Sequence, residues 1–348
     1  MGYIGAVIGA GFASGQDIIQ FFVSFGLYGL KGVILAGILF GILGGMLLYI
    51  AHQKKISTYQ DLLVILWGIR AAPIIDFLLA IFLFLGISTM LSASGAIFYE
   101  HINLSQGLGV FSAYVLTALF LIWGKNGLVT SFNVLVPIKI ILIIVITVYA
   151  AFFISSSQIG TYTAFLRPED IRFWGISSIL YVAYNFALAM VILTEYQTLT
   201  DKKGAVAGGI WGGLVLGFLL LLTFLALSKF LPVVLHYEVP MLYVAGNISL
   251  TAKHFYTIVL WLGILTTALA NTYGFAQRFA EFTGVSYKSC LIICLTLALP
   301  IAMQDFSVLV GKVYPLFGIL GLFIVGALIY KFTKEFLGQV YYNITQRK

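Results

Sequence analysis

Apolar stretches of about 20 residues, the length that a helix needs to cross a bilayer, follow one another from one end of the chain to the other. Short segments rich in turn-forming or charged residues separate them. The pattern predicts ten membrane-spanning helices, over residues 3–24, 28–51, 73–99, 108–124, 131–154, 174–197, 205–230, 254–280, 287–303 and 309–332. Residues 57–68 and 238–250 hold too few apolar positions to cross and are expected to form helices on the membrane surface.

Composition supports this interpretation. Of the 348 residues, 61% are hydrophobic and 9% charged, whereas a soluble domain carries roughly 25% charged residues. The soluble globular class is therefore excluded, and we expect the lipid bilayer as a partner. The net charge of +7 comes from short Lys and Arg clusters between apolar runs, so no nucleic-acid partner is expected. More of these clusters fall on one side of the predicted helices, which favours both termini in the cytoplasm.

Ten helices suggest two five-helix halves, which would be inverted relative to each other because five is odd. The predicted second and seventh helices both carry glycines spaced by four, a pattern that also occurs in ordinary close helix packing. These glycines are Gly37, Gly41 and Gly45 in one, and Gly204, Gly208, Gly212 and Gly209, Gly213, Gly217 in the other. We expect a first repeat over 1–155, a second over 172–332, together one transmembrane domain, and a cytoplasmic tail over 333–348.

The first predicted helix concentrates polar and small residues at its centre. The segment reads Gly9-Ala-Gly-Phe-Ala-Ser14-Gly-Gln-Asp17. Because each glycine costs about 1 kcal/mol relative to alanine inside a helix, we expect the helix to break near Gly9 to Ser14. Irregular backbone inside a membrane survives only where it faces protein or a cavity. Asp17, a carboxylate at membrane depth, has three open roles: binding a substrate amine, pairing with Lys139 or bonding the broken backbone.

The corresponding helix of the second half, around Tyr184-Asn185-Phe186-Ala187, contains no glycine at the equivalent point. It is either broken there or continuous with one buried amide. The third and eighth helices also carry small polar residues at membrane depth, among them Ser92 and Asn271. Such groups need partners in hydrocarbon, so they either bond neighbouring helices or line a path for a solute.

The first-helix motif, Gly9-Ala-Gly-Phe-Ala-Ser-Gly-Gln-Asp17, resembles the signature of the YkvI-type bacterial membrane proteins, a family of the amino acid–polyamine–organocation superfamily. The family pattern has glutamate where Asp17 stands. Tyr181-Val-Ala-Tyr184, followed eleven residues later by Glu195, is similar to the sixth helix of amino-acid permeases. The resemblance extends over essentially the whole chain through helix order.

This resemblance implies a leucine-transporter-like fold, a 5+5 inverted repeat in a bacterial cytoplasmic membrane, with helices 1 and 6 discontinuous. It also implies a secondary active transporter that moves a small solute, an amino acid or related zwitterion, by alternating access. The implied substrate-binding residues are Gly9, Gly11, Phe12, Ala13, Ser14, Tyr184, Asn185 and Ala187, to which the polar pattern adds Ser92 and Asn271.

Two alternatives stand for the coupling ion. Sodium prefers oxygen ligands, and the resemblance places a Na⁺ site at Gly5, Ile8, Gly263, Thr266 and Thr267, of which the last three share one helix face. The rival is Lys139, since proton-coupled relatives in the superfamily carry a fifth-helix lysine at that position. Lys139 could instead be a structural charge or extend its amine to the membrane surface.

Other classes fit the sequence less well. The four histidines fall at predicted helix ends or loops without metal-ligand spacing, and no catalytic grouping stands out, so we expect neither an enzyme nor a cofactor. A channel would also use polar residues in the membrane, but broken helices favour a closed binding site. A receptor with the same fold that binds a solute without moving it would share the pocket. The oligomeric state stays open.

Overall fold

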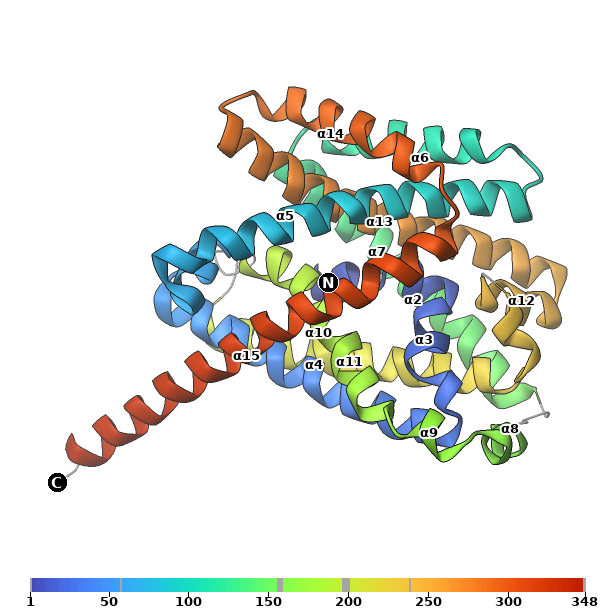
Figure 1. Cartoon of the computed structure of the whole chain (residues 1–348), viewed down its shortest axis with the longest axis horizontal. Coiled ribbons are helices and arrows are strands. Elements are labelled where there is room, and N and C mark those ends of the chain that lie inside the picture. The colour runs from blue at the N-terminus through green and yellow to red at the C-terminus, as the bar shows by residue number, and fades with distance from the viewer. Residues whose placement is uncertain (1, 57, 155–158, 196–200, 238, 347–348) are drawn as a thin grey trace.

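A computed structural model describes residues 2–56, 58–154, 159–195, 201–237 and 239–346, and the described residues form helices joined by turns (Figure 1). The α-helices are α1 Gly2–Val7, α2 Ala10–Ser14, α3 Gln16–Phe21, α4 Leu27–Lys54, α5 Tyr59–His101, α6 Gln106–Leu121, α7 Lys125–Phe153, α8 Ile159–Phe165, α9 Pro168–Ile171, α10 Trp174–Glu195, α11 Lys202–Ser228, α12 Pro240–Ile248, α13 Leu250–Thr283, α14 Tyr287–Ala302 and α15 Phe306–Gln346. The described residues also form the short 3-10 turns η1 Val23–Phe25 and η3 Val233–His236.

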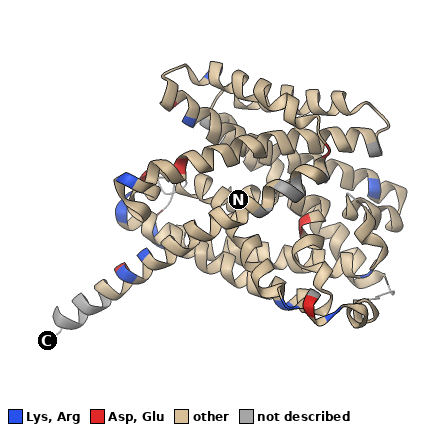
Figure 2. Ribbon diagram, viewed as in Figure 1, with Lys and Arg blue, Asp and Glu red and all other residues tan. Residues whose placement is uncertain are grey.

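The long helices have the length and composition of membrane spans. Among the described residues, seven helices are long and apolar enough to cross a bilayer, and α6 and α14 are shorter apolar helices. Large apolar side chains point outward from the bundle, such as Phe111 and Trp211, which are 61% and 67% exposed. Charged residues gather mostly at the margins of the molecule, with long uncharged helices between them (Figure 2). The predicted polytopic α-helical class is confirmed, while the inverted repeat of ten spans stays a prediction.

Close helix packing joins α4 to α11 through glycines of the sequence pattern. A Cβ added to Gly37 would lie 2.9 Å from the Cα of Gly217, and one added to Gly213 would overlap the backbone of Gly41. Glycine alone permits two backbones to approach so closely. The series Gly209, Gly213 and Gly217 therefore packs against α4, whereas Gly204, Gly208 and Gly212 do not face it.

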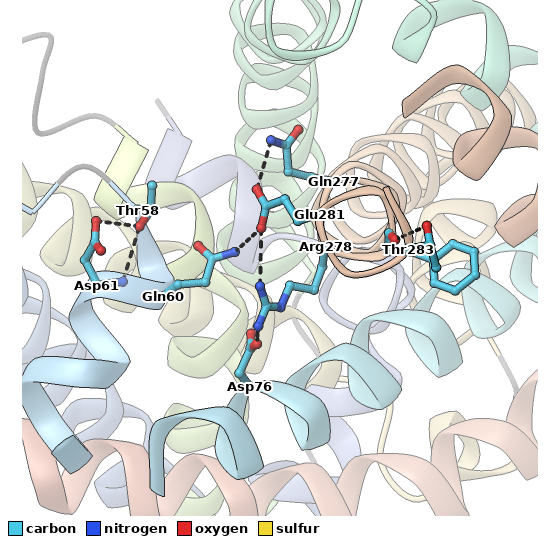
Figure 3. A network of polar contacts seen from close by, with 9 residues as sticks. Thr58, Gln60, Asp61, Asp76, Gln277, Arg278, Glu281 and Thr283 are labelled. Atoms are coloured by element: carbon cyan, nitrogen blue, oxygen red, sulfur yellow. Dashed lines mark hydrogen bonds and ion pairs between the residues drawn. The ribbon is translucent and has the colours of Figure 1, made fainter. Parts of the chain in front are cut away.

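A network of polar side chains connects α5 and α13. Gly68, with φ of +78°, separates the helical segment 59–67 from the rest of α5. Arg278 of α13 pairs with Asp76 of α5 and lies 3.3 Å from Glu281, which also accepts a hydrogen bond from Gln60 at 3.4 Å (Figure 3). These contacts tie the segment before Gly68, the start of the long part of α5 and the end of α13 together.

The last helix is longer than the sequence prediction. α15 continues as a helix to Gln346, through most of the predicted tail 333–348, and projects from the bundle (Figure 1). Lys331 and Glu335, four residues apart and 3.8 Å from each other, support the helix there. Residues 57, 155–158, 196–200, 238 and 347–348, where several predicted boundaries fall, lie outside the described residues.

The predicted break in the sixth helix is wrong. α10 runs unbroken from Trp174 to Glu195. The amide of Asn185 donates to the carbonyl of Tyr181 on the same helix, at 2.9 Å, so the buried amide has a partner without any loss of helix. No glycine lies near Asn185 to lower the cost of a break.

Candidate functional site

The first predicted helix is broken at Ile8 and Gly9, between α1 and α2. The Gly9 N–H bonds to the carbonyl of Val7 at 2.8 Å instead of reaching back four residues to Gly5, and Gly9 has extended backbone (φ −93°, ψ −163°). A Cβ at Gly9 would lie 2.5 Å from Oγ1 of Thr267 on α13. Close packing against α13 therefore requires glycine where the backbone leaves the helix, and the predicted break is confirmed at this point.

The amine of Lys139 lies at this break. Lys139, from α7, is fully buried. Its Nζ donates to the carbonyl oxygen of Ile8 at 2.5 Å and to Oγ1 of Thr266 at 2.8 Å. The Thr266 hydroxyl in turn donates to the carbonyl of Gly263 at 3.0 Å. A cation at the carbonyl end of α1 is favoured by the direction of the helix dipole.

The residues of the two ion hypotheses therefore meet at one place. Lys139 bonds two atoms that the sodium hypothesis assigns to Na⁺, on Ile8 and Thr266. Gly5 packs against Phe132 of α7. The hydroxyl of Thr267 is buried and has no hydrogen-bond partner among the described residues.

A second break follows at Gly15, whose φ of +82° lies in the left-handed region. The Ser14 hydroxyl donates to the carbonyl of Gly11 at 3.0 Å and accepts from the N–H of Gln16 at 3.2 Å, which bridges the break. Tyr256 of α13 donates its hydroxyl to the carbonyl of Ala13 at 2.8 Å. Side chains thus satisfy polar groups that a continuous helix would have paired itself.

Asp17, in the first turn of α3, faces α10. The hydroxyl of Tyr184 donates to Oδ2 of Asp17 at 2.6 Å. A Cβ at Gly11 would overlap the same carboxylate, so the absence of a side chain at Gly11 makes room for it. Asp17 is only 4% exposed, and its Oδ1 atom has no hydrogen-bond partner among the described residues.

The structure brings only some of the predicted substrate-binding residues together. Phe12 and Ala13 are buried in α2, and Ala187 is buried in α10. Ser92, by contrast, donates to the carbonyl of Gln304 at 2.5 Å, and Asn271 packs against Gly86 of α5. Ser92 thus contacts the segment before α15, and Asn271 contacts α5. The side chain of Glu195 lies outside the described part of the chain.

Sequence reasoning did not find Phe21 and Tyr314, two of the aromatic residues around Asp17. The ring of Tyr184 lies 5.7 Å from that of Phe21, 5.6 Å from that of Tyr181 and 5.2 Å from that of Tyr314, between ring centroids. Phe21 and Tyr314 come from α3 and α15, distant in sequence from Tyr181 and Tyr184 of α10. The tyrosine pair of α10 was visible as a motif, but no sequence signal linked it to Asp17.

A broken, buried first helix within a bundle of long apolar helices defines a multi-pass helical membrane protein. No family profile matches the chain. It is 30% identical to the uncharacterized membrane protein YkvI of Bacillus subtilis (strain 168) over 94% of both chains. It is also 27% identical to the uncharacterized protein YyaD of the same organism, again over 94% of both chains. The chain belongs to the YkvI family of membrane proteins.

Proposed function

We propose that this protein is a secondary active transporter that moves a small solute, an amino acid or related zwitterion, across the cytoplasmic membrane, driven by the movement of protons in the same direction. The observation that carries the proposal is the amine of Lys139, buried at the break between α1 and α2 and bonded to Ile8 and Thr266. Ionisable groups at membrane depth are costly and occur mostly where ions or protons move.

The position of the amine favours protons over sodium. A sodium ion would need the carbonyl oxygen of Ile8 and the hydroxyl of Thr266, and the amine of Lys139 already bonds both. Two cations would repel each other at this separation. A proton leaving Lys139 would weaken its bonds to α1 and α13, so protonation would change how three helices are held together.

The broken first helix is the proposed place for the solute. Within the described residues, the backbone amides of Gly11 and Phe12 have no backbone acceptor, because the helix that would supply it stops at Val7. Free amides of this kind suit a carboxylate group. The resemblance to amino-acid permeases supports a zwitterion bound between this segment and α10, which carries Tyr184. Alternating access would then open the segment to each side of the membrane in turn.

Uptake into proteoliposomes tests the proposal. The purified protein would be reconstituted and supplied with a panel of radiolabelled amino acids under an inward proton gradient, an inward sodium gradient or neither. We expect accumulation driven by the proton gradient alone. Lys139→Ala should abolish gradient-driven accumulation, whereas Lys334→Ala, an exposed lysine of α15, should leave it unchanged.

Each other outcome has a definite meaning. Accumulation driven by sodium, with Lys139→Ala unaffected, would reject the proton assignment. Binding of a solute without uptake under any gradient would favour a receptor with the same fold. Rapid dissipative flux that no gradient concentrates would favour a channel.

A further inference from the structure

The carboxylate of Asp17 is buried without a positive partner. Asp17 is 4% exposed, and among the described residues it forms no ion pair. Its one hydrogen bond comes from Tyr184, and Oδ1 has none. The buried amine of Lys139 is bonded to Ile8 and Thr266 instead. A buried carboxylate normally has a cation or several donors around it, and the described residues supply Asp17 with one donor and no cation.

Aromatic rings gather beside the same carboxylate. Phe21, Tyr181, Tyr184 and Tyr314 are all buried, and Tyr184 lies within 5.7 Å of the other three, measured between ring centroids. The hydroxyl of Tyr181 has no hydrogen-bond partner among the described residues. The faces of such rings attract ammonium groups, and aromatic clusters with a nearby carboxylate bind them strongly because charge and ring attraction add.

We propose that Asp17 and this aromatic cluster, defined as Phe21, Tyr181, Tyr184 and Tyr314, bind a positively charged nitrogen of the transported solute. The inference rests on the proposed function and names the class of its substrate. The solute carries an ammonium or alkylated ammonium group, and a purely anionic solute is not a substrate. In the closed arrangement described here, the hydroxyl of Tyr184 occupies one carboxylate oxygen, and an arriving cation would bind the other.

The segment that carries Asp17 is bounded by two glycines with positive φ. α3 begins after Gly15, with φ of +82°, and the chain changes direction again at Gly26, with φ of +58°. Glycines in the left-handed region rotate at little steric cost. A tilt of α3 about these two points would separate Asp17 from Tyr184 and open the carboxylate to a solute. The Asp17–Tyr184 hydrogen bond is thus a closing contact that the solute would replace.

Binding of simple ammonium probes tests the inference directly. The full-length protein in lipid nanodiscs would be titrated with tetramethylammonium and ethylammonium chloride, with sodium propionate as the anionic control, by calorimetry and by the shift in Tm. We expect the ammonium probes to bind and raise Tm, and propionate to do neither at equal ionic strength. Asp17→Asn should lower ammonium affinity at least tenfold, Asp17→Glu should restore part of it, and Tyr184→Phe should weaken it a few-fold.

Asp76→Asn is the matched control. Asp76 is the other buried aspartate among the described residues, but it already pairs with Arg278. Its replacement should leave ammonium affinity unchanged even where Tm falls. If Asp17→Asn does not fold, Tyr181→Phe, which removes only a hydroxyl, should still alter the affinity ratio between the two ammonium probes.

Failure of this inference and failure of the proposed function give different results. Gradient-driven uptake that ammonium probes do not inhibit, with Asp17→Asn fully active, would overturn the inference and leave the transporter intact. Ammonium binding that depends on Asp17, without uptake under any gradient, would support the inference and reject transport. Equal ammonium affinity in wild type and Asp17→Asn would also overturn the inference.

Discussion

The hydrogen bond between Lys139 and Thr266 can be measured by a double-mutant cycle. Lys139→Met removes the amine but keeps much of the apolar stem, and Thr266→Val replaces the hydroxyl with a methyl group of similar size. Lys139→Met alone changes the free energy of unfolding through two opposing contributions. It removes bonds to Ile8 and Thr266 but also relieves the molecule of a buried charge. The coupling energy between the two substitutions isolates the bond.

The magnitude follows from the geometry. A hydrogen bond to a charged group contributes about 1.5–3 kcal/mol in soluble proteins, while cycles measured inside membranes average about 0.6 and reach about 1.7 kcal/mol. The Lys139–Thr266 bond is 2.8 Å long and both side chains are fully buried. We therefore expect a coupling energy near the upper membrane value, about 1–2 kcal/mol. With methionine at 139, Thr266→Val should cost only its weak bond to Gly263.

Unfolding of the purified protein by SDS in mixed micelles, followed by tryptophan fluorescence, provides the four free energies. Thr147→Val is the control, because Thr147 is buried on the same helix as Lys139 but its hydroxyl bonds to Ile143 at 2.7 Å. Thr147→Val and Lys139→Met should be additive. A Lys139–Thr266 coupling energy of zero would show that the amine does not bond this hydroxyl and would remove the basis for assigning the proton to Lys139.

Two further predictions concern packing and the polar network. Gly213→Ala should lower the free energy of unfolding by about 1–3 kcal/mol, since its Cβ would overlap the backbone of Gly41, whereas Gly208→Ala, with no atom within 4 Å of its Cβ, should not; equal Tm values for the two would contradict the close contact. Arg278→Gln should lower the free energy of unfolding by about 3 kcal/mol because it leaves Asp76 buried without a cation. Adding Asp76→Asn to Arg278→Gln should recover part of this loss, measured as a rise in Tm relative to Arg278→Gln alone.

Much of the helical pattern follows from hydrophobicity alone. The predicted span 174–197 matches α10 at its start, and 287–303 matches α14 at both ends within a residue. Apolar length determines these helices, so sequence suffices. The end of α15 was missed because Lys331, Lys334 and Glu335 mark an end to apolar sequence without ending the helix. Charged residues are good helix formers, and the sequence contains no stop signal there.

The site was predictable where backbone chemistry decides. The glycines around position 9 predicted the first break, because glycine lowers the free-energy cost of leaving a helix. At Asn185, the sequence is compatible with two structures. The buried amide could bond a carbonyl of its own continuous helix, or it could bond backbone groups exposed by a break in that helix. The Asp17–Tyr184 contact and the meeting of Lys139 with Thr266 join residues more than a hundred positions apart. Nothing in a single sequence records which distant side chains share a face.

The glycine contact between α4 and α11 has a mechanical consequence. Because backbone touches backbone along the line of Gly37, Gly41, Gly213 and Gly217, almost no rotamers lie between the two helices to absorb a displacement. One helix comes from each predicted half of the chain. A tilt of the helix from the first half should therefore displace the helix from the second half by a similar amount. We therefore expect α4 and α11 to move together as one rigid unit during any rearrangement of the broken first segment.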